Sequence, residues 1–299
     1  MSIIPFDDRE GWIWWDGQLI PWRDAKLHVL SHGLHYGSAV FEGERMYDGQ
    51  IFALVEHTER LLASAELLDF EIPFSADALN QACLETCAAN RLRDCYVRPI
   101  AWRGAEQLSV SARQTTTHVA IAAWEWPKYF DPSTLRRGIR LAWAKYRRPS
   151  AASAPVAAKA VGLYMICTVS KNAAERAGYD DALMLDGVGN IAETTGANIF
   201  FARDGELYTP IADCFLNGIT RQTVMRLARD NGVQVIETRI RPADLGAYSE
   251  CFVVGTAAEV TPVREIAGQR FTPGELTRTL MDAYGELVRA AAPTPAFAE

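Results

Sequence analysis

A single lysine lies in an apolar stretch near the middle of the chain. Residues 155–164 read PVAAKAVGLY, so Lys159 stands among alanines, valines and a glycine, with Tyr164 five residues later. An ammonium group in an apolar setting loses hydration, which lowers its pKa and makes the amine a better nucleophile toward aldehydes. Lys159 is therefore a candidate Schiff-base lysine. The alternative is an exposed lysine whose stem lies over small residues while its ammonium group stays in water.

Two further stretches are suited to binding a phosphate through backbone N–H groups. The sequence Asn217-Gly218-Ile219-Thr220 directly precedes a predicted helix over residues 221–231, and a helix N-terminus attracts anions. The sequence Gly255-Thr256-Ala257-Ala258 follows a predicted strand and forms a turn of small residues, with amides and one hydroxyl to offer. No GxxxxGK[ST] sequence occurs, which argues against a nucleoside triphosphate site.

Arg60 is the first of two arginines that require an anionic partner. It falls in the first turn of a predicted amphipathic helix over residues 57–70. A cation there opposes the helix dipole unless an anion is bound nearby. The alternative is an exposed arginine paired to Glu56 or Glu59.

Arg98 is the second. A predicted strand over residues 95–102 places it on one face with Tyr96 and Ile100. An unpaired charge in so apolar a strand is costly. Its partner is either a structural carboxylate or the carboxylate of a ligand, and both interpretations stay open.

A lysine, a phosphate site and a carboxylate together are the set that pyridoxal 5'-phosphate requires. The lysine binds the aldehyde, the amides and an arginine hold the phosphate, and the carboxylate partners the pyridine nitrogen. Glu193, in a predicted hairpin strand, supplies the carboxylate, and Tyr164 is placed to donate to the phenolic oxygen of the ring. The sequence therefore predicts a pyridoxal-phosphate enzyme.

Seven motifs carry a closer resemblance. They are SHGLHYGSAVFEGER (31–45), EHTERL (56–61), YVRP (96–99), AAKAVGLY (157–164), AETTGANIFF (192–201), LNGITR (216–221) and GTAAEVTPV (255–263). In this order they resemble the branched-chain-amino-acid aminotransferases, class IV pyridoxal-phosphate enzymes of fold type IV. The resemblance implies a transaminase that moves the amino group of L-leucine, L-isoleucine or L-valine to 2-oxoglutarate.

The resemblance also implies the role of each site residue. Lys159 would be the Schiff-base lysine and proton carrier. The cofactor-binding residues would be Lys159, Arg60, Tyr164, Glu193, Leu216, Gly218, Ile219, Thr220 and Thr256. The substrate-binding residues would be Tyr36, Phe41, Gly43, Tyr96, Arg98, Trp126, Tyr129, Thr256, Ala257 and Ala258. Tyr36, Arg98 and Tyr129 would accept the side-chain carboxylate of glutamate, beside an apolar pocket for branched side chains.

The resemblance implies a mixed α/β (α+β) fold with a small N-terminal α/β domain over residues 1–124 and a large C-terminal pseudo-barrel domain over 139–299 that binds the cofactor. The prolines and the change of periodicity at 125–138 predict the connection between them. Hairpin turns are predicted at Asp16-Gly17, Asp48-Gly49 and Asp204-Gly205, and helices over 76–90 and 163–177. The tail 291–299 is expected to fray.

Two departures from the family pattern stand out. The loop 104–112, GAEQLSVSA, is less glycine-rich than the family's, and the resemblance implies that it reaches the neighbouring subunit's site and shapes side-chain specificity. Glu44 stands where an aliphatic residue is common, and we expect it to face solvent beside Arg45.

Composition excludes several classes of protein. The 299 residues are 49% hydrophobic and 22% charged, with a net charge of −7, which argues against a nucleic-acid partner. No apolar run approaches about 18 residues, and the N-terminus lacks the features of a secretory signal, so we expect a cytoplasmic protein that spans no membrane. The six cysteines form no CxxC pair and are expected to be reduced and structural. A homodimer, with a larger homo-oligomer as the alternative, follows from the resemblance alone.

Other functions fit the sequence less well. A D-amino-acid aminotransferase or an R-amine transaminase would use the same lysine, but the Tyr-x-Arg pattern at 96–98 argues against both. An aminodeoxychorismate lyase would also use it, but the set EGER, YVRP and GTAAEVTP argues against that enzyme. His28 and His32 are spaced for a zinc site, but no third ligand is evident, so hydrogen-bonding histidines and no metal are expected. A non-catalytic binding protein would leave Lys159 unexplained.

Overall fold

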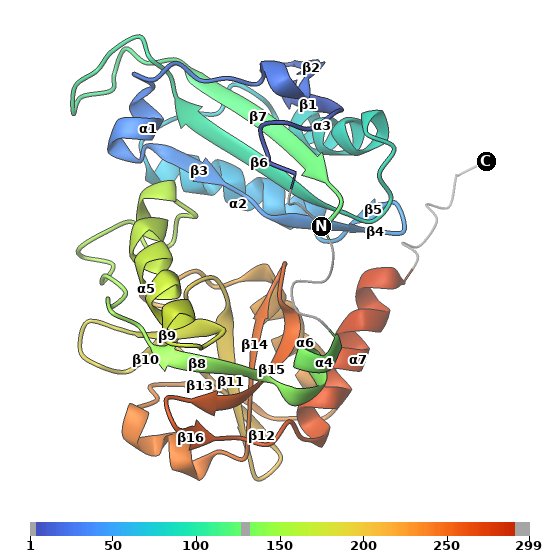
Figure 1. Ribbon diagram of the computed structural model, residues 1–299, viewed down its shortest axis with the longest axis vertical. Coiled ribbons are helices and arrows are strands. Elements are labelled where there is room, and N and C mark those ends of the chain that lie inside the picture. Colours follow the sequence, from blue (N-terminus) through green and yellow to red (C-terminus); the bar gives the residue numbers. More distant parts are fainter. Residues whose placement is uncertain (1–3, 127–131, 291–299) are drawn as a thin grey trace.

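The structure is a computed structural model, which describes residues 4–126 and 132–290. In this part of the chain the strands form two sheets, each with its own helices (Figure 1): the first is antiparallel and the second is mixed. The first sheet has the strand order β2-β1-β7-β6-β4-β5, with β3 beside β6. The second has the order β10-β9-β8-β15-β14-β11-β12-β13, with β16 beside β15. The predicted mixed α/β fold is confirmed.

The first sheet and its helices occupy residues 12–124, in the upper part of Figure 1. The strands are β1 (Trp12–Trp15), β2 (Gln18–Pro21), β3 (Ala39–Phe41), β4 (Glu44–Tyr47), β5 (Gln50–Ile51), β6 (Cys95–Arg103) and β7 (Thr117–Trp124). The helices are η1 (Trp22–Asp24), α1 (His32–Tyr36), α2 (Leu54–Leu67) and α3 (Ala76–Ala89).

The second sheet and its helices follow from residue 132, in the lower part of Figure 1. The strands are β8 (Ile139–Trp143), β9 (Asp181–Leu185), β10 (Ile191–Thr194), β11 (Asn198–Arg203), β12 (Glu206–Pro210), β13 (Val235–Thr238), β14 (Glu250–Gly255), β15 (Glu259–Ile266) and β16 (Gln269–Arg270). The helices are α4 (Pro132–Arg137), η2 (Val161–Tyr164), α5 (Met165–Arg176), α6 (Ile219–Asp230), η3 (Pro242–Ala247) and α7 (Glu275–Arg289).

The three predicted Asp-Gly hairpin turns are confirmed. Both residues of each turn have positive φ, as at Asp48-Gly49, where the angles are 50° and 89° between β4 and β5. Two-residue turns of this type match the twist of the strands they join, and glycine adopts the second conformation without a steric cost. These turns fix the register of β1 with β2, β4 with β5 and β11 with β12.

Several predicted boundaries are wrong by a few residues. Helix α2 begins at Leu54 rather than at residue 57, because Ala53 adopts a left-handed conformation and Leu54 packs against the core. The predicted helix over 163–177 begins as the 3-10 turn η2 before α5. The predicted connection holds the helix α4, while residues 127–131 and the tail 291–299 lie outside the described residues.

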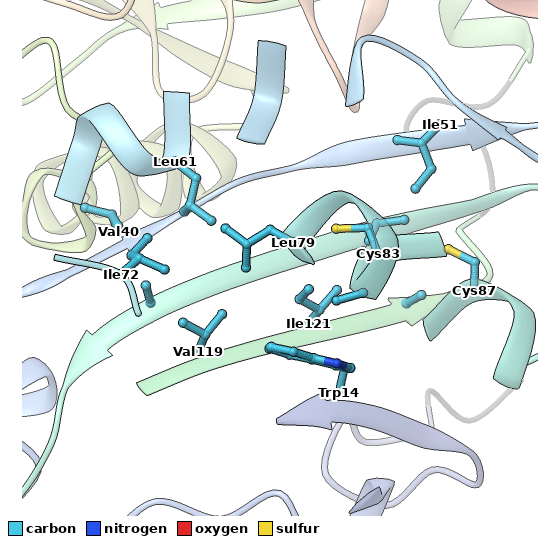
Figure 2. Close-up of a cluster of buried hydrophobic side chains, with 14 of the residues drawn as sticks. Trp14, Val40, Ile51, Leu61, Ile72, Leu79, Cys83, Cys87, Val119 and Ile121 are labelled. Carbon is cyan, nitrogen blue, oxygen red and sulfur yellow. The ribbon is translucent and has the colours of Figure 1, made fainter. Parts of the chain in front are cut away.

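The core of the first sheet lies between its strands and the helices α2 and α3. Leu61 from α2 and Leu79 and Cys83 from α3 face Val119 and Ile121 of β7 (Figure 2). All six cysteines are buried and free, as predicted, and Cys83 and Cys87 share the buried face of α3. Within the described ranges, no helix has the length and apolar character needed to cross a membrane.

Glu44 is buried in this core, so the prediction that it faces solvent is wrong. Its side chain is 0% exposed, and neither carboxylate oxygen accepts an N–H or O–H hydrogen bond in the described structure. Strand alternation is the reason, because Glu44 points to the same side as Met46, which packs in the core. Burial, together with the nearby Glu42 carboxylate, raises the pKa of Glu44 well above its usual range, so the side chain is a neutral acid.

Replacing Glu44 with methionine is expected to raise the free energy of unfolding at pH 8 by about 1–3 kcal/mol. The folded protein keeps a proton on Glu44 that the unfolded chain releases above about pH 4.5. Its contribution to stability is therefore full below that pH and falls as the pH rises toward the folded-state pKa. Urea unfolding should show a larger gain at pH 8 than at pH 5, and an equal gain at both would contradict the neutral acid.

Candidate active site

The segment that carries Lys159 is pinned between α2 and β3. The Lys159 backbone N–H donates to Ser64 Oγ of α2 at 3.0 Å, and its carbonyl accepts from the Phe41 N–H at 3.1 Å. The side chain is half-buried, and its Nζ donates to the Tyr164 hydroxyl at 2.9 Å. Backbone contacts on both sides therefore fix where the amine lies.

The predicted low pKa of Lys159 is wrong for the protein alone. Burial lowers the pKa, as the apolar sequence suggested, but Tyr164 and the Glu42 carboxylate outweigh it, and the net shift is upward. The prediction from residues 155–164 did not include Glu42, because Glu42 lies more than one hundred residues away in the chain. The amine is therefore an ammonium until a ligand changes its surroundings.

One pocket contains every predicted cofactor-binding residue. It is lined by Lys159, Arg60, Tyr164, Glu193, Leu216, Gly218, Ile219, Thr220 and Thr256. The pocket is also lined by Arg148, Cys167, Asn198 and two residues at the end of β14, Val254 and Gly255. The pocket thus joins the N-terminus of α6, the turn after β14, the strand β10 and the lysine segment.

Glu193 sits in this pocket with two polar partners that the sequence did not single out. Its carboxylate lies 3.3 Å from Arg148 Nε and accepts from Asn198 Nδ2 at 3.1 Å. Burial raises the pKa of Glu193 to about 7, against the opposing effects of Arg148 and Lys159. A carboxyl near neutrality can share a proton with a pyridine nitrogen, which is the pairing expected of this cofactor.

The start of α6 offers backbone N–H groups to an anion. Gly218 is its N-cap, and a Cβ there would lie only 2.4 Å from Asn198 Oδ1, so the backbone packs where no side chain fits. The first N–H groups of a helix have no partner within it. Thr220 is buried and lines the pocket, whereas Arg221 turns away to Asn217, Pro210 and Glu237.

Arg60 reaches the pocket from α2, but not from the first turn of the helix. Because α2 begins at Leu54, Arg60 lies in its second turn, and the helix-dipole argument for an anion there is wrong. Its pairing with Glu56 or Glu59 is also wrong. Its Nε and Nη2 donate to the two carboxylate oxygens of Glu42, at 2.6 and 2.7 Å.

An aromatic wall stands beside the pocket. The Phe41 ring packs edge-on against Tyr164 at 4.8 Å and lies 5.0 Å from Lys159 Nζ. The Arg98 guanidinium lies over Phe41 at 4.7 Å, and Tyr96 packs against Trp126 at 4.6 Å. Phe41, Tyr96, Arg98 and Trp126 are therefore brought together, one layer out from the cofactor residues.

Arg98 has no carboxylate partner in the described part of the chain. Its Nη2 donates to the Tyr96 hydroxyl at 3.2 Å, and its buried Nε has no partner. The structural ion pair considered from the sequence is thus not seen among these residues. An unpaired guanidinium beside an aromatic wall is suited to the carboxylate of a ligand.

Gly43 is required by the position of Tyr96. A Cβ at residue 43 would meet the Tyr96 hydroxyl oxygen at 2.0 Å, so any side chain must push that hydroxyl away. Gly43→Ala is expected to lower kcat/KM for L-leucine by about 10-fold or more while the fold is kept. Gly187→Ala is the control, because nothing lies within 4 Å of its Cβ. An unchanged kcat/KM in Gly43→Ala would show that the Tyr96 hydroxyl has no part in binding.

Three other predicted substrate residues, Tyr36, Ala257 and Ala258, do not line this pocket within the single chain. Tyr36 is 48% exposed on α1, and its ring contacts are with His32 and His35 of the same helix. Ala257 and Ala258 follow Thr256 in the turn but do not line the pocket. Tyr129 lies outside the described residues.

The histidines considered for zinc have other partners. His32 is buried, with Nδ1 2.6 Å from Ser38 Oγ and Nε2 2.8 Å from the Ser109 carbonyl oxygen, as expected for a hydrogen-bonding histidine. Across residues 4–126 and 132–290, no group of three or more His, Cys, Asp or Glu side chains is arranged to hold a metal ion.

Comparisons with known proteins identify the family of the chain. Residues 39–266 match the family described as Amino-transferase class IV, so the chain belongs to the class IV aminotransferases. Its relatives include the branched-chain-amino-acid aminotransferase of Pseudomonas aeruginosa, which is 41% identical over 288 residues that cover 94% of each chain. The resemblance predicted from the seven motifs is confirmed.

Solved structures give the same answer. A branched-chain amino acid aminotransferase with pyridoxamine 5'-phosphate has a TM-score of 0.92 and 40% identity, covering 95% of this chain and 96% of that one. The branched-chain amino acid aminotransferase of Escherichia coli has a TM-score of 0.91 and 35% identity, covering 97% of this chain and 98% of that one. The chain is a transaminase by family, and its fold is that of these enzymes.

Proposed function

We propose that this protein transfers the amino group of L-leucine, L-isoleucine or L-valine to 2-oxoglutarate with pyridoxal 5'-phosphate as cofactor. The observation that carries this proposal is the single pocket around Lys159. It collects an amine, a carboxyl near neutrality, a helix N-terminus and an arginine from four separate parts of the chain. The bound cofactor supplies an electron-withdrawing ring that stabilises negative charge at the substrate α-carbon.

Each residue of the pocket has a role that its position supports. Lys159 Nζ would bind the aldehyde and move the α-proton, and Tyr164 holds Nζ in place. Glu193, set by Arg148 and Asn198, would partner the ring nitrogen. The N–H groups at Ile219 and Thr220, together with Thr256 and Arg60, would hold the phosphate. Leu216, which lines the pocket, would pack against the ring.

Two different side chains have to share one substrate pocket. The aromatic wall of Phe41, Tyr96 and Trp126 suits an alkyl group. Arg98, at the edge of that wall, suits the second carboxylate of glutamate. With the cation held at the edge over Phe41, an alkyl side chain binds without covering an unpaired charge. The turn at Thr256, Ala257 and Ala258, with Tyr96, would bind the α-carboxylate.

A coupled assay tests the substrate class. The protein with pyridoxal phosphate, 2-oxoglutarate and L-leucine should yield L-glutamate, whereas D-alanine in place of L-leucine should give about 10²-fold less or none. Turnover of D-alanine at the same rate would instead favour the D-amino-acid aminotransferases. Release of pyruvate from a chorismate-derived amine would favour the lyase.

We also propose that the enzyme works as a homodimer. Val29, Leu34 and Val110 are 68%, 62% and 85% exposed, and His32 ties the loop that holds Val110 to α1. A second copy covering this apolar surface would let Tyr36 and the loop 104–112 serve the partner's pocket. This accounts for the absence of Tyr36 from the lining of the pocket in its own chain.

The division into domains and the cellular location are proposals of the same kind. A division at residues 1–124, 125–138 and 139–299 places one sheet in each domain, with Lys159 at their junction. Six buried free thiols suit the reducing conditions of the cytoplasm.

A further inference from the structure

Two glutamates on the same side of one strand edge have opposite surroundings. Glu42 and Glu44 are both 0% exposed and two residues apart, with Glu42 just after β3 and Glu44 at the start of β4. Glu44 accepts no N–H or O–H hydrogen bond among the described residues, whereas Glu42 accepts from Arg60 Nε and Nη2 and from His57 Nδ1, at 2.6, 2.7 and 2.7 Å. Glu42 is thus a buried carboxylate that accepts three hydrogen bonds from side-chain N–H groups. Of its two partners, Arg60 lines the pocket around Lys159, so the role of Glu42 is sought in its effect on Arg60.

Glu42 is the charged member of the pair. Burial raises its pKa, but the Arg60 guanidinium and the His57 ring outweigh that effect and hold the pKa at about 2. Burial lowers the pKa of His57, so its ring is neutral and donates one N–H. Glu42 and Arg60 are therefore a buried, two-pronged ion pair, clamped from the side by His57.

The geometry of Arg60 decides what this pair can do. A guanidinium has five N–H groups in a rigid plane, and two of its three nitrogens are engaged by Glu42. Both N–H groups of Nη1 and the second N–H of Nη2 remain, on a side chain that lines the pocket with Thr220 and Thr256. Fixing Nε and Nη2 fixes the plane, and so the direction in which the remaining N–H groups point.

We infer that Glu42, clamped by His57, is a positioning residue that aims the Arg60 guanidinium at the phosphate of the cofactor. The inference rests on the proposed function. Glu42 would act by preorganisation, because a guanidinium that is already held in its binding orientation loses no rotamer freedom when the phosphate binds. Glu42 also balances the charge of Arg60, so that the arginine is not left unpaired when no phosphate is bound.

The test compares two ligands that differ only in the phosphate. Full-length protein freed of cofactor is titrated with pyridoxal 5'-phosphate and with pyridoxal, following quenching of the fluorescence of its eight tryptophans. In Glu42→Gln the Kd for pyridoxal 5'-phosphate should rise by about 10- to 100-fold, since charge-assisted hydrogen bonds of this kind are at stake. The Kd for pyridoxal should change by less than about twofold, because it makes no use of Arg60.

Glu44→Gln is the matched control. It makes the same substitution at an equally buried glutamate on the same strand edge, but at a side chain that makes no hydrogen bond or ion pair with Arg60 in the described structure. Both Kd values should match those of the parent protein. His57→Gln is the second variant, since it leaves the Arg60–Glu42 pair in place. In this variant the Kd for pyridoxal 5'-phosphate should rise by less than in Glu42→Gln, and the Kd for pyridoxal should again stay nearly unchanged.

Three results would overturn the inference. The first is an equal rise of the Kd for both ligands in Glu42→Gln, and the second is no rise of either Kd in that variant. The third is a rise of the Kd for pyridoxal 5'-phosphate in Glu44→Gln as large as in Glu42→Gln. Each of these results indicates a purely structural role for Glu42. If Glu42→Gln does not fold, the His57→Gln titration decides, and a loss that ignores the phosphate would reject the positioning role. Parent protein that binds neither ligand would instead reject the proposed function itself.

Discussion

Lys159→Ala is expected to lower turnover of L-leucine by at least about 10³-fold while the protein still binds pyridoxal phosphate. The amine lies in the pocket, hydrogen-bonded to Tyr164 and fixed by the backbone contacts to Ser64 and Phe41. Methyl in place of the butylammonium chain removes the nucleophile and the base, but leaves the phosphate-binding residues intact. Turnover is measured by the release of 4-methyl-2-oxopentanoate, and cofactor binding by fluorescence.

Lys145→Ala is the control, because Lys145 is exposed and lines no part of the pocket. It should keep the parent's turnover. Near-normal activity of Lys159→Ala would contradict the assignment of the central lysine. Added methylamine should restore part of the lost rate, because a free amine can enter the space left by the side chain and take over the proton transfer.

Arg98→Gln is expected to separate the two half-reactions. The guanidinium meets no carboxylate of the described chain, so its charge is available to the second carboxylate of glutamate. We expect kcat/KM for L-glutamate to fall by about 10²-fold or more, the cost of leaving a ligand carboxylate without its charged partner. For L-leucine, kcat/KM should change by less than about threefold. Single-turnover kinetics with each amino acid alone measure the two values.

Arg93→Gln supplies the comparison, since Arg93 is exposed and its side chain donates, among the described residues, only to the Asp48 carbonyl oxygen. It should affect neither substrate. An equal loss for glutamate and leucine in Arg98→Gln would mean that Arg98 orders the aromatic wall through Phe41 and Tyr96 instead of binding the carboxylate.

Local sequence signals predicted the local structure well. Asp16-Gly17 and Asp204-Gly205 require positive φ in both residues, and hairpins formed there. The strand predicted over residues 95–102 begins at Cys95 and ends one residue later than predicted, at Arg103, because alternation and β-branched residues act within one segment. The helix α7 was missed, although Leu280, Tyr284 and Val288 recur at helical spacing and are all buried.

The errors concern contacts between distant segments. Glu42 is 18 residues from Arg60 and more than one hundred from Lys159, yet it pairs with the one and raises the pKa of the other. Nothing in the sequence indicated that Arg148 is a site residue, yet in the structure it lies beside Glu193. Partners of this kind are set by the packing of segments that are distant in the chain, on which a single sequence carries no local signal.

The visible absorption spectrum of the purified protein with pyridoxal phosphate tests the central claim most directly. The account predicts an absorption band of the bound cofactor that bleaches when L-leucine is added and returns when 2-oxoglutarate follows. Together these changes require the cofactor, the lysine chemistry and both substrates. A band that is indifferent to L-leucine would contradict the substrate class, and the absence of any band would contradict the role of Lys159.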